Sequence, residues 1–348
     1  MIDEILERVL EGNTTKVDAL YLASLPSQEL LHLADQLRRE EVGDTVTYVI
    51  NRNINFTNSC IGNCSFCAFK SETGYILSEE QILQKVQEAV EIGATEICIQ
   101  GGLLGGMMLE DYCGMLNSIK SHFEVHIHAF SPMEIFHAAR NSNVDIKYAL
   151  KALKNSGLNS MPGTAAEILD DSIRRKICPS KISAEQWINI ITTAHSLGIP
   201  TTATILYGHV ESFDDRIDHI LLIRDVQQKT KGFTEFIPLP FMSNNNPLGK
   251  VTHRSKGIDD IKVHAISRIL LHKSIKNIQS SWVKLGVKSA QTMLLYGVND
   301  LGGTLMEEKI TKSAGGTAGE YLSPKELENI ITDVGRIPRR RNTLYELI

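Results

Sequence analysis

The sequence is poor in three things: cysteine, long apolar runs and excess basic charge. Only six of its 348 residues are cysteines, and no stretch approaches the roughly 20 apolar residues that a membrane-spanning helix needs. The N-terminal residues are acidic and amphipathic, unlike a signal peptide. The net charge of −5 gives no sign of a nucleic-acid-binding surface, and the one basic cluster, residues 336–341, is short enough to be a solvated segment. We therefore expect a cytoplasmic protein with no membrane or nucleic-acid partner, in which clustered cysteines are metal ligands or redox groups rather than disulfides.

The pattern of apolar residues predicts an α/β fold. Residues 1–45 have helical periodicity, and after them apolar β-rich runs alternate with longer helical patterns such as 78–93 and 183–198. The predicted strands are 45–56, 95–102, 124–130, 157–161, 200–208, 233–241, 277–283 and 295–300. About eight strand–helix units indicate a parallel (β/α)8 TIM-type barrel. A doubly wound sheet is the alternative, but no glycine-rich segment matches the dinucleotide-binding pattern.

The same pattern predicts three parts of the chain. Residues 1–45 form an N-terminal helical segment, 46–310 the barrel, and 311–348 a C-terminal extension packed on the barrel. In such a barrel, chemistry sits on the loops that follow the carboxyl ends of the strands. That rule directs attention to residues directly after the predicted strands, among them Cys60, Cys64, Cys67, Gln100, Gly101, Gly102, His128, Ser131, residues 207–211 and residues 299–304.

Three cysteines with the spacing CxxxCxxC follow the first predicted strand: Cys60, Cys64 and Cys67. A structural zinc site normally has four ligands in two pairs, and no second pair follows here. A 4Fe–4S cluster has four irons, so three thiolates leave one iron open to another ligand. An open metal position favours catalysis over a scaffold that binds zinc or a cluster without turnover.

This motif at the end of the first strand of a parallel barrel resembles the radical S-adenosylmethionine (SAM) superfamily. The resemblance implies one 4Fe–4S cluster on Cys60, Cys64 and Cys67, with the amino and carboxylate groups of SAM on the fourth iron. Reductive cleavage of SAM then releases methionine and a 5′-deoxyadenosyl radical. The turn at 100–102 lacks the acidic residue that relatives carry there, so only its backbone contacts are carried over. The residues expected at the cofactor are Phe66, Gln100, Gly101, Gly102, Ser131, Glu167 and Tyr207.

Further segments narrow the resemblance. They are residues 51–69, 126–135, 157–169, 203–212, 233–241 and 297–308, and together they resemble the family of the second subunit of FO synthase. That family implies cleavage of L-tyrosine at Cα–Cβ and transfer of the 4-hydroxybenzyl group to 5-amino-6-(D-ribitylamino)uracil, in deazaflavin biosynthesis. It also implies two partners, FO synthase subunit 1 and an electron donor. The alternative is one of two radical SAM enzymes of the futalosine route to menaquinone, aminofutalosine synthase or cyclic dehypoxanthine futalosine synthase.

A substrate rich in hydroxyls and amides needs a pocket with many neutral polar groups. The residues expected to bind substrate are Asn53, Asn55, His126, Asn299, Asp300 and Thr304, and the acid–base candidates are His209, Glu211 and His128. Several of these residues also have structural interpretations. Glu211 can cap a helix, His128 can be a hydrogen-bonded histidine of the barrel interior, Tyr207 can be core packing, and Glu167 can favour a helix N-terminus.

Overall fold

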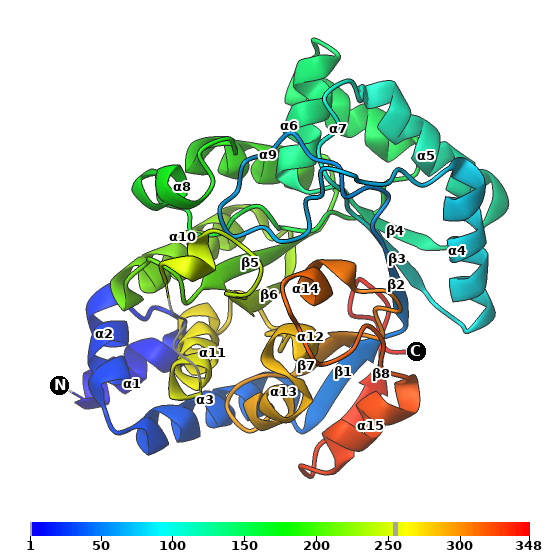
Figure 1. Ribbon diagram of the computed structural model, residues 1–348. Coiled ribbons are helices and arrows are strands. Elements are labelled where there is room, and N and C mark those ends of the chain that lie inside the picture. Colours follow the sequence, from blue (N-terminus) through cyan, green and yellow to red (C-terminus); the bar gives the residue numbers. More distant parts are fainter. Residues whose placement is uncertain (1, 253–256) are drawn as a thin grey trace.

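The parallel strands of the chain form a closed ring. The computed structural model describes residues 2–252 and 257–348 (Figure 1). The strands are β1 (Thr45–Val49), β2 (Asn51–Ile54), β3 (Glu96–Ile99), β4 (His126–Ala129), β5 (Thr201–Tyr207), β6 (Phe233–Pro240), β7 (Asp300–Gly303) and β8 (Ile337–Arg340). β2 pairs with β3 and β3 with β4, β5 pairs with β6, and β7 pairs with β1, all in parallel.

Two short segments complete the ring where regular strands are missing. His128 of β4 bridges to Ser160, and Met161 bridges to Thr201 of β5. On the other side, residues 278 and 279 bridge Phe236 of β6 to Asp300 of β7. The predicted strands 157–161 and 277–283 are therefore each reduced to two isolated bridges, and the first predicted strand is divided at Ile50 into β1 and β2. With eight positions around a closed parallel ring, the predicted (β/α)8 barrel is confirmed.

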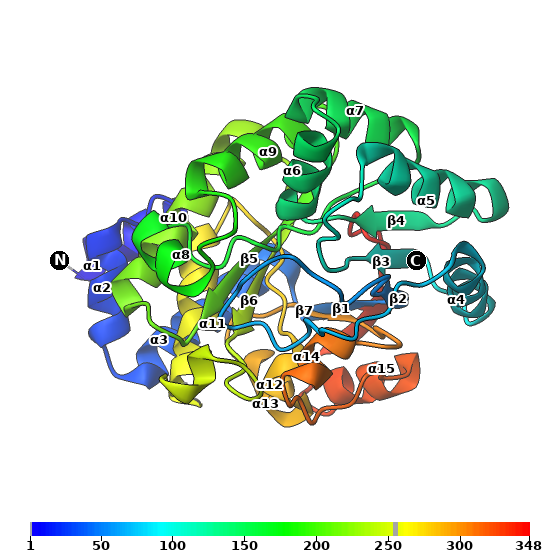
Figure 2. The same cartoon turned by 45° about the horizontal axis from the view of Figure 1, so that its top comes forward.

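Helices surround the ring on its outer side (Figure 2). They are α1 (Ile2–Glu11), α2 (Lys16–Ser24), α3 (Ser27–Val42), α4 (Glu79–Glu91), α5 (Leu109–His122), α6 (Pro132–Asn141), α7 (Ile146–Asn155), α8 (Asp171–Ile177), α9 (Ala184–Ser196), α10 (Phe213–Thr230), α11 (Ile258–Leu271), α12 (Trp282–Leu285), α13 (Val287–Met293), α14 (Lys309–Ser313), α15 (Pro324–Thr332) and the short 3-10 helix η1 (Leu248–Lys250). The predicted N-caps Ser78 and Ser183 form capping boxes with Gln81 and Gln186.

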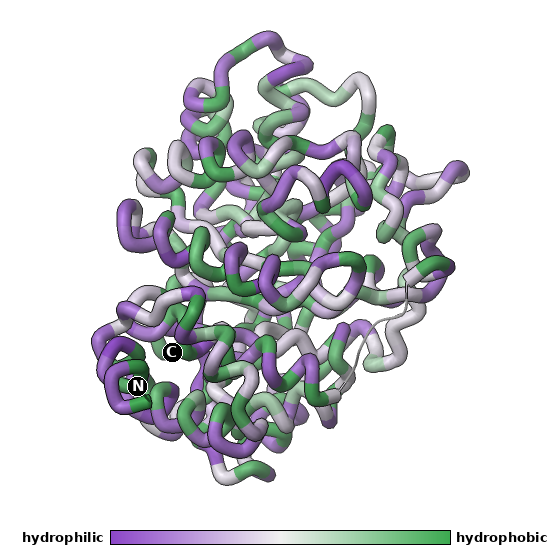
Figure 3. The backbone as a smooth tube through the Cα atoms, turned by 90° about the vertical axis from the view of Figure 1, so that its left-hand side faces the viewer, coloured by the Kyte–Doolittle hydropathy of each residue, from purple (hydrophilic) through white to green (hydrophobic). Residues whose placement is uncertain are grey.

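The sequence pattern of these helices fits their place at the surface of the barrel. Green and purple segments, hydrophobic and hydrophilic, alternate along the outer helices in Figure 3, as expected for helices with one face on a core and one in water. Among the described residues, no helix combines the length and apolar character needed to cross a membrane.

The C-terminal segment enters the barrel at the amino-terminal ends of the strands. β8 pairs with the edge of β1 that is not taken by β7, with Thr45 opposite Ile337 and Tyr48 opposite Arg340. Beyond Ile50 the same edge belongs to β3, which pairs with β2. The division of the first strand therefore lets two neighbours, β8 and β3, share one edge.

Directly after β8, the chain carries a buried cation into the barrel. Arg341 is buried, and its guanidinium donates from Nε to Asp300 Oδ2 at 2.6 Å and from a terminal nitrogen to Oδ1 at 3.1 Å. Asp300 also accepts from Thr47 Oγ1 at 2.5 Å and from the backbone of Gly302 at 2.6 Å. Tyr345 donates to Glu235 Oε2 of β6 at 2.7 Å. These contacts tie β1, β6, β7 and the C-terminal segment together.

This arrangement predicts that Arg341→Met destabilises the fold. The substitution leaves the Asp300 carboxylate buried without its cation, and removing one partner of a buried pair costs about 3–5 kcal/mol. Arg339→Met is the matched control, because Arg339 is an exposed arginine of the same strand, and surface substitutions usually change stability by less than about 0.5 kcal/mol. Urea denaturation of the two variants and the wild type measures the difference. Equal midpoints for all three would contradict the structural role of Arg341.

Candidate active site

The three cysteines lie on the loop between β2 and α4, at the carboxyl ends of the strands. The loop is closed on itself by Thr57, whose hydroxyl donates to the carbonyl of Tyr75 at 2.6 Å. It is also held from outside, because the backbone N–H of Ser65 donates to the carbonyl of Ile177 in α8 at 2.8 Å. The loop is therefore anchored at both its base and its tip.

The thiols lie where a cluster could form. Cys60, Cys64 and Cys67 are free and half-buried. Cys60 Sγ accepts from the backbone N–H groups of Gly62 at 3.2 Å and Leu103 at 3.3 Å, and such donors stabilise a thiolate. Burial raises the pKa of the Cys64 thiol to about 11, so in this protein metal binding must displace its proton.

The arrangement of the thiols distinguishes a cluster from a single ion. Within residues 2–252 and 257–348, no three His, Cys, Asp or Glu side chains converge on a point that one metal ion could occupy. A cubane cluster requires no such convergence, because each iron takes its own thiolate. Three thiols with this spacing therefore fit a cluster in which each holds one iron.

The turn after β3 packs directly on the cysteine loop. A Cβ atom on Gly102 would lie 2.1 Å from the carbonyl oxygen of Ser59, and one on Gly101 would lie 2.6 Å from the ring of Phe56. Neither position can carry a side chain without moving the loop. This close packing explains both glycines of the turn and brings the next backbone N–H, that of Leu103, to Cys60.

A cavity of about 420 Å³ extends from the cysteine loop into the barrel. Its volume lies within the range of small-molecule sites. Residues expected from the sequence to act at the site that line it are Asn53, Asn55, Cys60, Cys64, Phe66, Cys67, Gln100, Gly101, Gly102, His128, Ser131 and Glu167. Residues from the barrel interior that the sequence did not single out also line it, among them Glu96, Glu134, Lys181, Glu235, Gln279 and Arg341.

Glu167 has a partner that the sequence did not indicate. Lys181 Nζ lies 2.5 Å from Glu167 Oε1 and 5.3 Å from the centre of the Phe66 ring. Burial alone would raise the pKa of Glu167, but the Lys181 ammonium and the Arg174 guanidinium, together with hydrogen bonds, lower it below its usual value. Glu167 is therefore an ionised, paired carboxylate beside the cysteine loop. Lys181 lies in a short loop before α9, with no local motif to mark it.

The residues predicted after β5 do not line the cavity. Tyr207 is buried and donates to Asp260 Oδ1 at 2.8 Å. Glu211 accepts from the backbone of Gly208 at 2.5 Å and from Arg216 Nε at 2.7 Å. Burial opposes the ionisation of Glu211, but these donors together with His209 lower its pKa to about 2. Tyr207, His209 and Glu211 thus hold the turn after β5, and their expected cofactor and acid–base roles stay predictions.

The residues predicted near β7 join strands instead of lining the cavity. Asn299 Oδ1 accepts from Arg268 at 2.7 Å and from the backbone of Ile278 at 2.9 Å. Thr304 Oγ1 donates to the carbonyl of Asn51 at 2.7 Å, and Asp300 pairs with Arg341 as described above. Their expected contact with substrate also stays a prediction.

His126 and His128 share one hydroxyl group. Ser160 Oγ lies 2.7 Å from His126 Nε2 and 2.7 Å from His128 Nδ1. Burial lowers the pKa of both imidazoles, that of His126 to about 4, although the Glu96 carboxylate works in the opposite direction. Both rings are therefore neutral near pH 7, and His128 lies at the cavity while His126 is half-buried at the beginning of β4.

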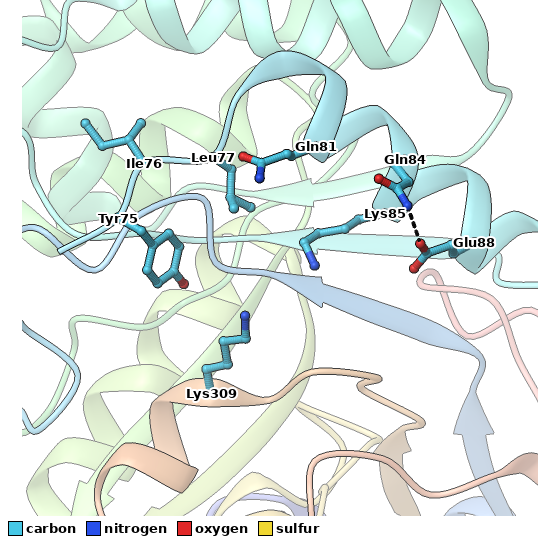
Figure 4. A pocket seen from close by; sticks show the side chains of 8 residues that line it. All are labelled: Tyr75, Ile76, Leu77, Gln81, Gln84, Lys85, Glu88 and Lys309. Atoms are coloured by element: carbon cyan, nitrogen blue, oxygen red, sulfur yellow. Dashed lines mark hydrogen bonds between the residues drawn. The ribbon is translucent and has the colours of Figure 1, made fainter.

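A second cavity, of about 320 Å³, lies outside the barrel beside α4 (Figure 4). Lys85 and Lys309 line it together with Tyr75. Both lysines pair with Glu307, at 2.6 Å and 3.5 Å. Each lysine therefore has a carboxylate partner, and none of the three clustered cysteines lines this cavity.

Comparisons with known proteins agree with this geometry. Residues 54–223 match the model of the radical SAM superfamily, and residues 230–348 match that of the CofH/MqnC C-terminal region. Methylornithine synthase has the same fold, with a TM-score of 0.77 and 18% identity over 96% of this chain and 97% of that one. The FeFe-hydrogenase maturase HydG from Carboxydothermus hydrogenoformans also has this fold, with a TM-score of 0.76 and 16% identity over 99% of this chain and 80% of that one.

Relatives with much higher sequence identity cover more than nine-tenths of the chain. The 5-amino-6-(D-ribitylamino)uracil–L-tyrosine 4-hydroxyphenyl transferase 1 of Methanosarcina acetivorans is 54% identical, over 99% of this chain and 94% of its own. The transferase of the same name from Archaeoglobus fulgidus is 58% identical, over 92% and 94%. The chain belongs to the radical SAM superfamily and, within it, to the family of the 5-amino-6-(D-ribitylamino)uracil–L-tyrosine 4-hydroxyphenyl transferases.

Proposed function

We propose that the protein is a radical SAM transferase that cleaves L-tyrosine at Cα–Cβ and transfers the 4-hydroxybenzyl group to 5-amino-6-(D-ribitylamino)uracil. The products are 5-amino-5-(4-hydroxybenzyl)-6-(D-ribitylimino)-5,6-dihydrouracil, 2-iminoacetate, methionine and 5′-deoxyadenosine. The observation that carries the proposal is the full-length identity of 54% to transferases of that name, in a chain whose three cysteines open onto a cavity of suitable size.

In this proposal Cys60, Cys64 and Cys67 hold a 4Fe–4S cluster, and the fourth iron is left for SAM. When bound, the cluster and SAM supply a 5′-deoxyadenosyl radical that takes a hydrogen atom from tyrosine. The loop that carries the thiols is fixed by its packing on Gly101 and Gly102. Phe66, with Lys181 above its ring, also lines the cavity, and in this proposal its ring covers the adenine of SAM.

The deeper part of the cavity is proposed to bind the substrates. Asn53 of β2, Asn55 directly after β2, and Gln279 between β6 and β7 line the cavity. Asn55 Oδ1 is buried without a hydrogen-bond partner, and such an atom costs free energy unless a ligand or water completes it. Ribitylaminouracil is uncharged and rich in N–H and O–H donors, so neutral amides of this kind suit it.

The reaction releases two protons. The ribitylamino N–H of the uracil loses one when the adduct radical gives back the electron that the cluster would have supplied to SAM, and the tyrosine nitrogen loses the other. Tyrosine enters with an ammonium group that carries three hydrogens, and 2-iminoacetate leaves with a single N–H. One of the two lost hydrogens leaves as an atom, so the other must leave as a proton. In this proposal His128 accepts the proton through Nε2, because Nδ1 is held by Ser160 and Nε2 forms no hydrogen bond with any residue that the structure describes.

The hydrogen bonds of Ser160 allow the proton to move on. A hydroxyl donates one hydrogen bond, so Ser160 donates to one imidazole and accepts from the other. If His128 Nδ1–H donates to Ser160 and Ser160 donates to His126 Nε2, uptake of a proton at His128 Nε2 can shift each hydrogen along the chain. The proton then rests on His126, which is half-buried at the far end of the strand.

Two further partners belong to the proposal. Reductive cleavage of SAM needs an electron donor, and the benzyl adduct needs an enzyme that closes the deazaflavin ring system. We propose FO synthase subunit 1 for the second role, in a contact that need not be permanent. The C-terminal match covers both CofH and MqnC, so a futalosine-type substrate is kept as an outcome of the experiment.

The first experiment tests the substrates. Anaerobic, cluster-loaded protein with a reductant and SAM is expected to form 5′-deoxyadenosine only when tyrosine and ribitylaminouracil are both present, with the benzyl adduct detected by mass spectrometry. Futalosine-pathway substrates are expected to give no product. Turnover with those substrates but not with tyrosine would replace the proposed reaction and leave the superfamily intact.

The second experiment tests the proton path. Ser160→Ala removes the bridging hydroxyl, and we expect product formation to fall about 10-fold or more, within the usual contribution of acid–base groups. Ser160→Thr keeps the hydroxyl and is expected to restore most of the rate. Iron content and thermal melting show whether each variant folds and loads its cluster. A Ser160→Ala protein with the rate and pH profile of the wild type would exclude the path.

A further inference from the structure

Glu134 lies in the first turn of α6, and its carboxylate is buried beside the part of the cavity that the cysteine loop borders. It is the third residue of that helix and forms a capping box with Ser131, whose backbone N–H and hydroxyl both donate to Oε2 at 2.7 Å. Its other oxygen, Oε1, accepts from the backbone N–H of Gly101 at 3.1 Å. Only 2% of the residue is exposed to solvent, and it lines the cavity.

This carboxylate lacks a cation. Two other carboxylates of the cavity have one, since Glu167 pairs with Lys181 at 2.5 Å and Glu235 lies 3.9 Å from Arg341. Glu134 forms no ion pair within the described parts of the chain, and Lys181 is already bound to Glu167. Burial raises the pKa of Glu134 to about 7, against the hydrogen bonds that favour its ionised form. A buried carboxylate in this state gains from a ligand that brings positive charge.

The position of Glu134 indicates which ligand that is. Gly101, which donates to Glu134, is two residues before Leu103, which donates to Cys60 Sγ. One short turn therefore connects the carboxylate with a cysteine of the cluster loop. The turn itself has glutamine and two glycines at 100–102, with no acidic side chain of its own.

We propose that Glu134 receives the α-amino group of SAM, and so supplies from α6 the carboxylate that the turn at 100–102 lacks. SAM is cationic, so it provides the charge that this part of the protein is missing. The inference rests on the binding of SAM in the proposed function and is independent of the substrates proposed there. A second amino acid, tyrosine, carries the same α-amino group, and the experiment separates the two.

The test uses Glu134→Gln, which removes the charge and retains the fold. Glutamine is an accepted third residue of a capping box, as Gln81 and Gln186 show in α4 and α9. The dissociation constant of SAM is measured by anaerobic equilibrium dialysis of cluster-loaded protein without tyrosine or uracil substrate. We expect it to rise about 10-fold or more, the loss typical of a hydrogen bond to a charged group. An analogue of SAM without the amino group is expected to bind wild type and E134Q equally.

The matched control is Glu326→Gln in α15. Glu326 occupies the same position of a capping box with Ser323 but is exposed, so SAM affinity should not change. Unchanged SAM affinity in E134Q would overturn the proposal, as would equal weakening of SAM and the analogue, which indicates a structural role. Weaker binding of tyrosine with normal binding of SAM would assign the carboxylate to the substrate and also overturn it.

A second variant keeps the test decisive if E134Q loads its cluster poorly. Glu134→Asp retains the charge but shortens its reach, and with normal iron content it should bind SAM several-fold more weakly than the wild type. Wild-type affinity in E134D would count against the proposal. Because none of these measurements involves turnover, a failure of the proposed substrates leaves their result unaffected.

Discussion

The buried ion pair between Arg341 and Asp300 joins the end of the chain to the last strand of the ring. Asp300 also binds Thr47 of the first strand, so a single carboxylate fixes three segments that are far apart in the sequence. The same region holds Glu235 through Tyr345. These charged groups lie inside the barrel, where an unpaired charge has a large free-energy cost. Their pairing with one another therefore stabilises the closed end of the cavity. The C-terminal segment is therefore part of the barrel interior, since both Arg341 and Thr343 line the cavity.

The opposite end of the cavity depends on close packing rather than on charge. The cysteine loop has little regular structure, and its position is set by backbone contacts with the turn after β3 and with α8. Glycine at positions 101 and 102 permits an approach that no other residue allows. A loop held in this way can present three thiols without rearranging, and preorganised ligands favour a single cluster geometry.

The sequence was sufficient for features that depend on local pattern. The strand–helix alternation predicted the barrel, and the spacing of Cys60, Cys64 and Cys67 indicated the radical SAM superfamily, to which the comparisons assign the chain. The roles of residues such as Glu211 and Asn299 were harder to predict, because a polar side chain at a strand end can bind either a ligand or a neighbouring part of the protein. In the structure both bind arginines that lie on other elements, Arg216 and Arg268. Arg216 is close to Glu211 in the sequence, but no motif marks the pair. Arg268 reaches Asn299 only through tertiary packing, which one sequence without homologues does not reveal.

Sequence reasoning missed other residues of the site for the same reason, because their partners lie on other elements. Lys181 reaches Glu167, Ser160 reaches two histidines, and Glu134 reaches Gly101. Each contact crosses between elements, and none has a motif of its own. Together with Glu235 and Arg341, they leave charged groups at two places along the cavity. At the base of the barrel, Glu235 lies 3.9 Å from the Arg341 guanidinium, whereas Glu134, which binds the turn beside the cysteine loop, has no cation among the described residues. A buried carboxylate without a cation favours a positively charged ligand, so a cationic ligand suits the loop end of the cavity better than its base.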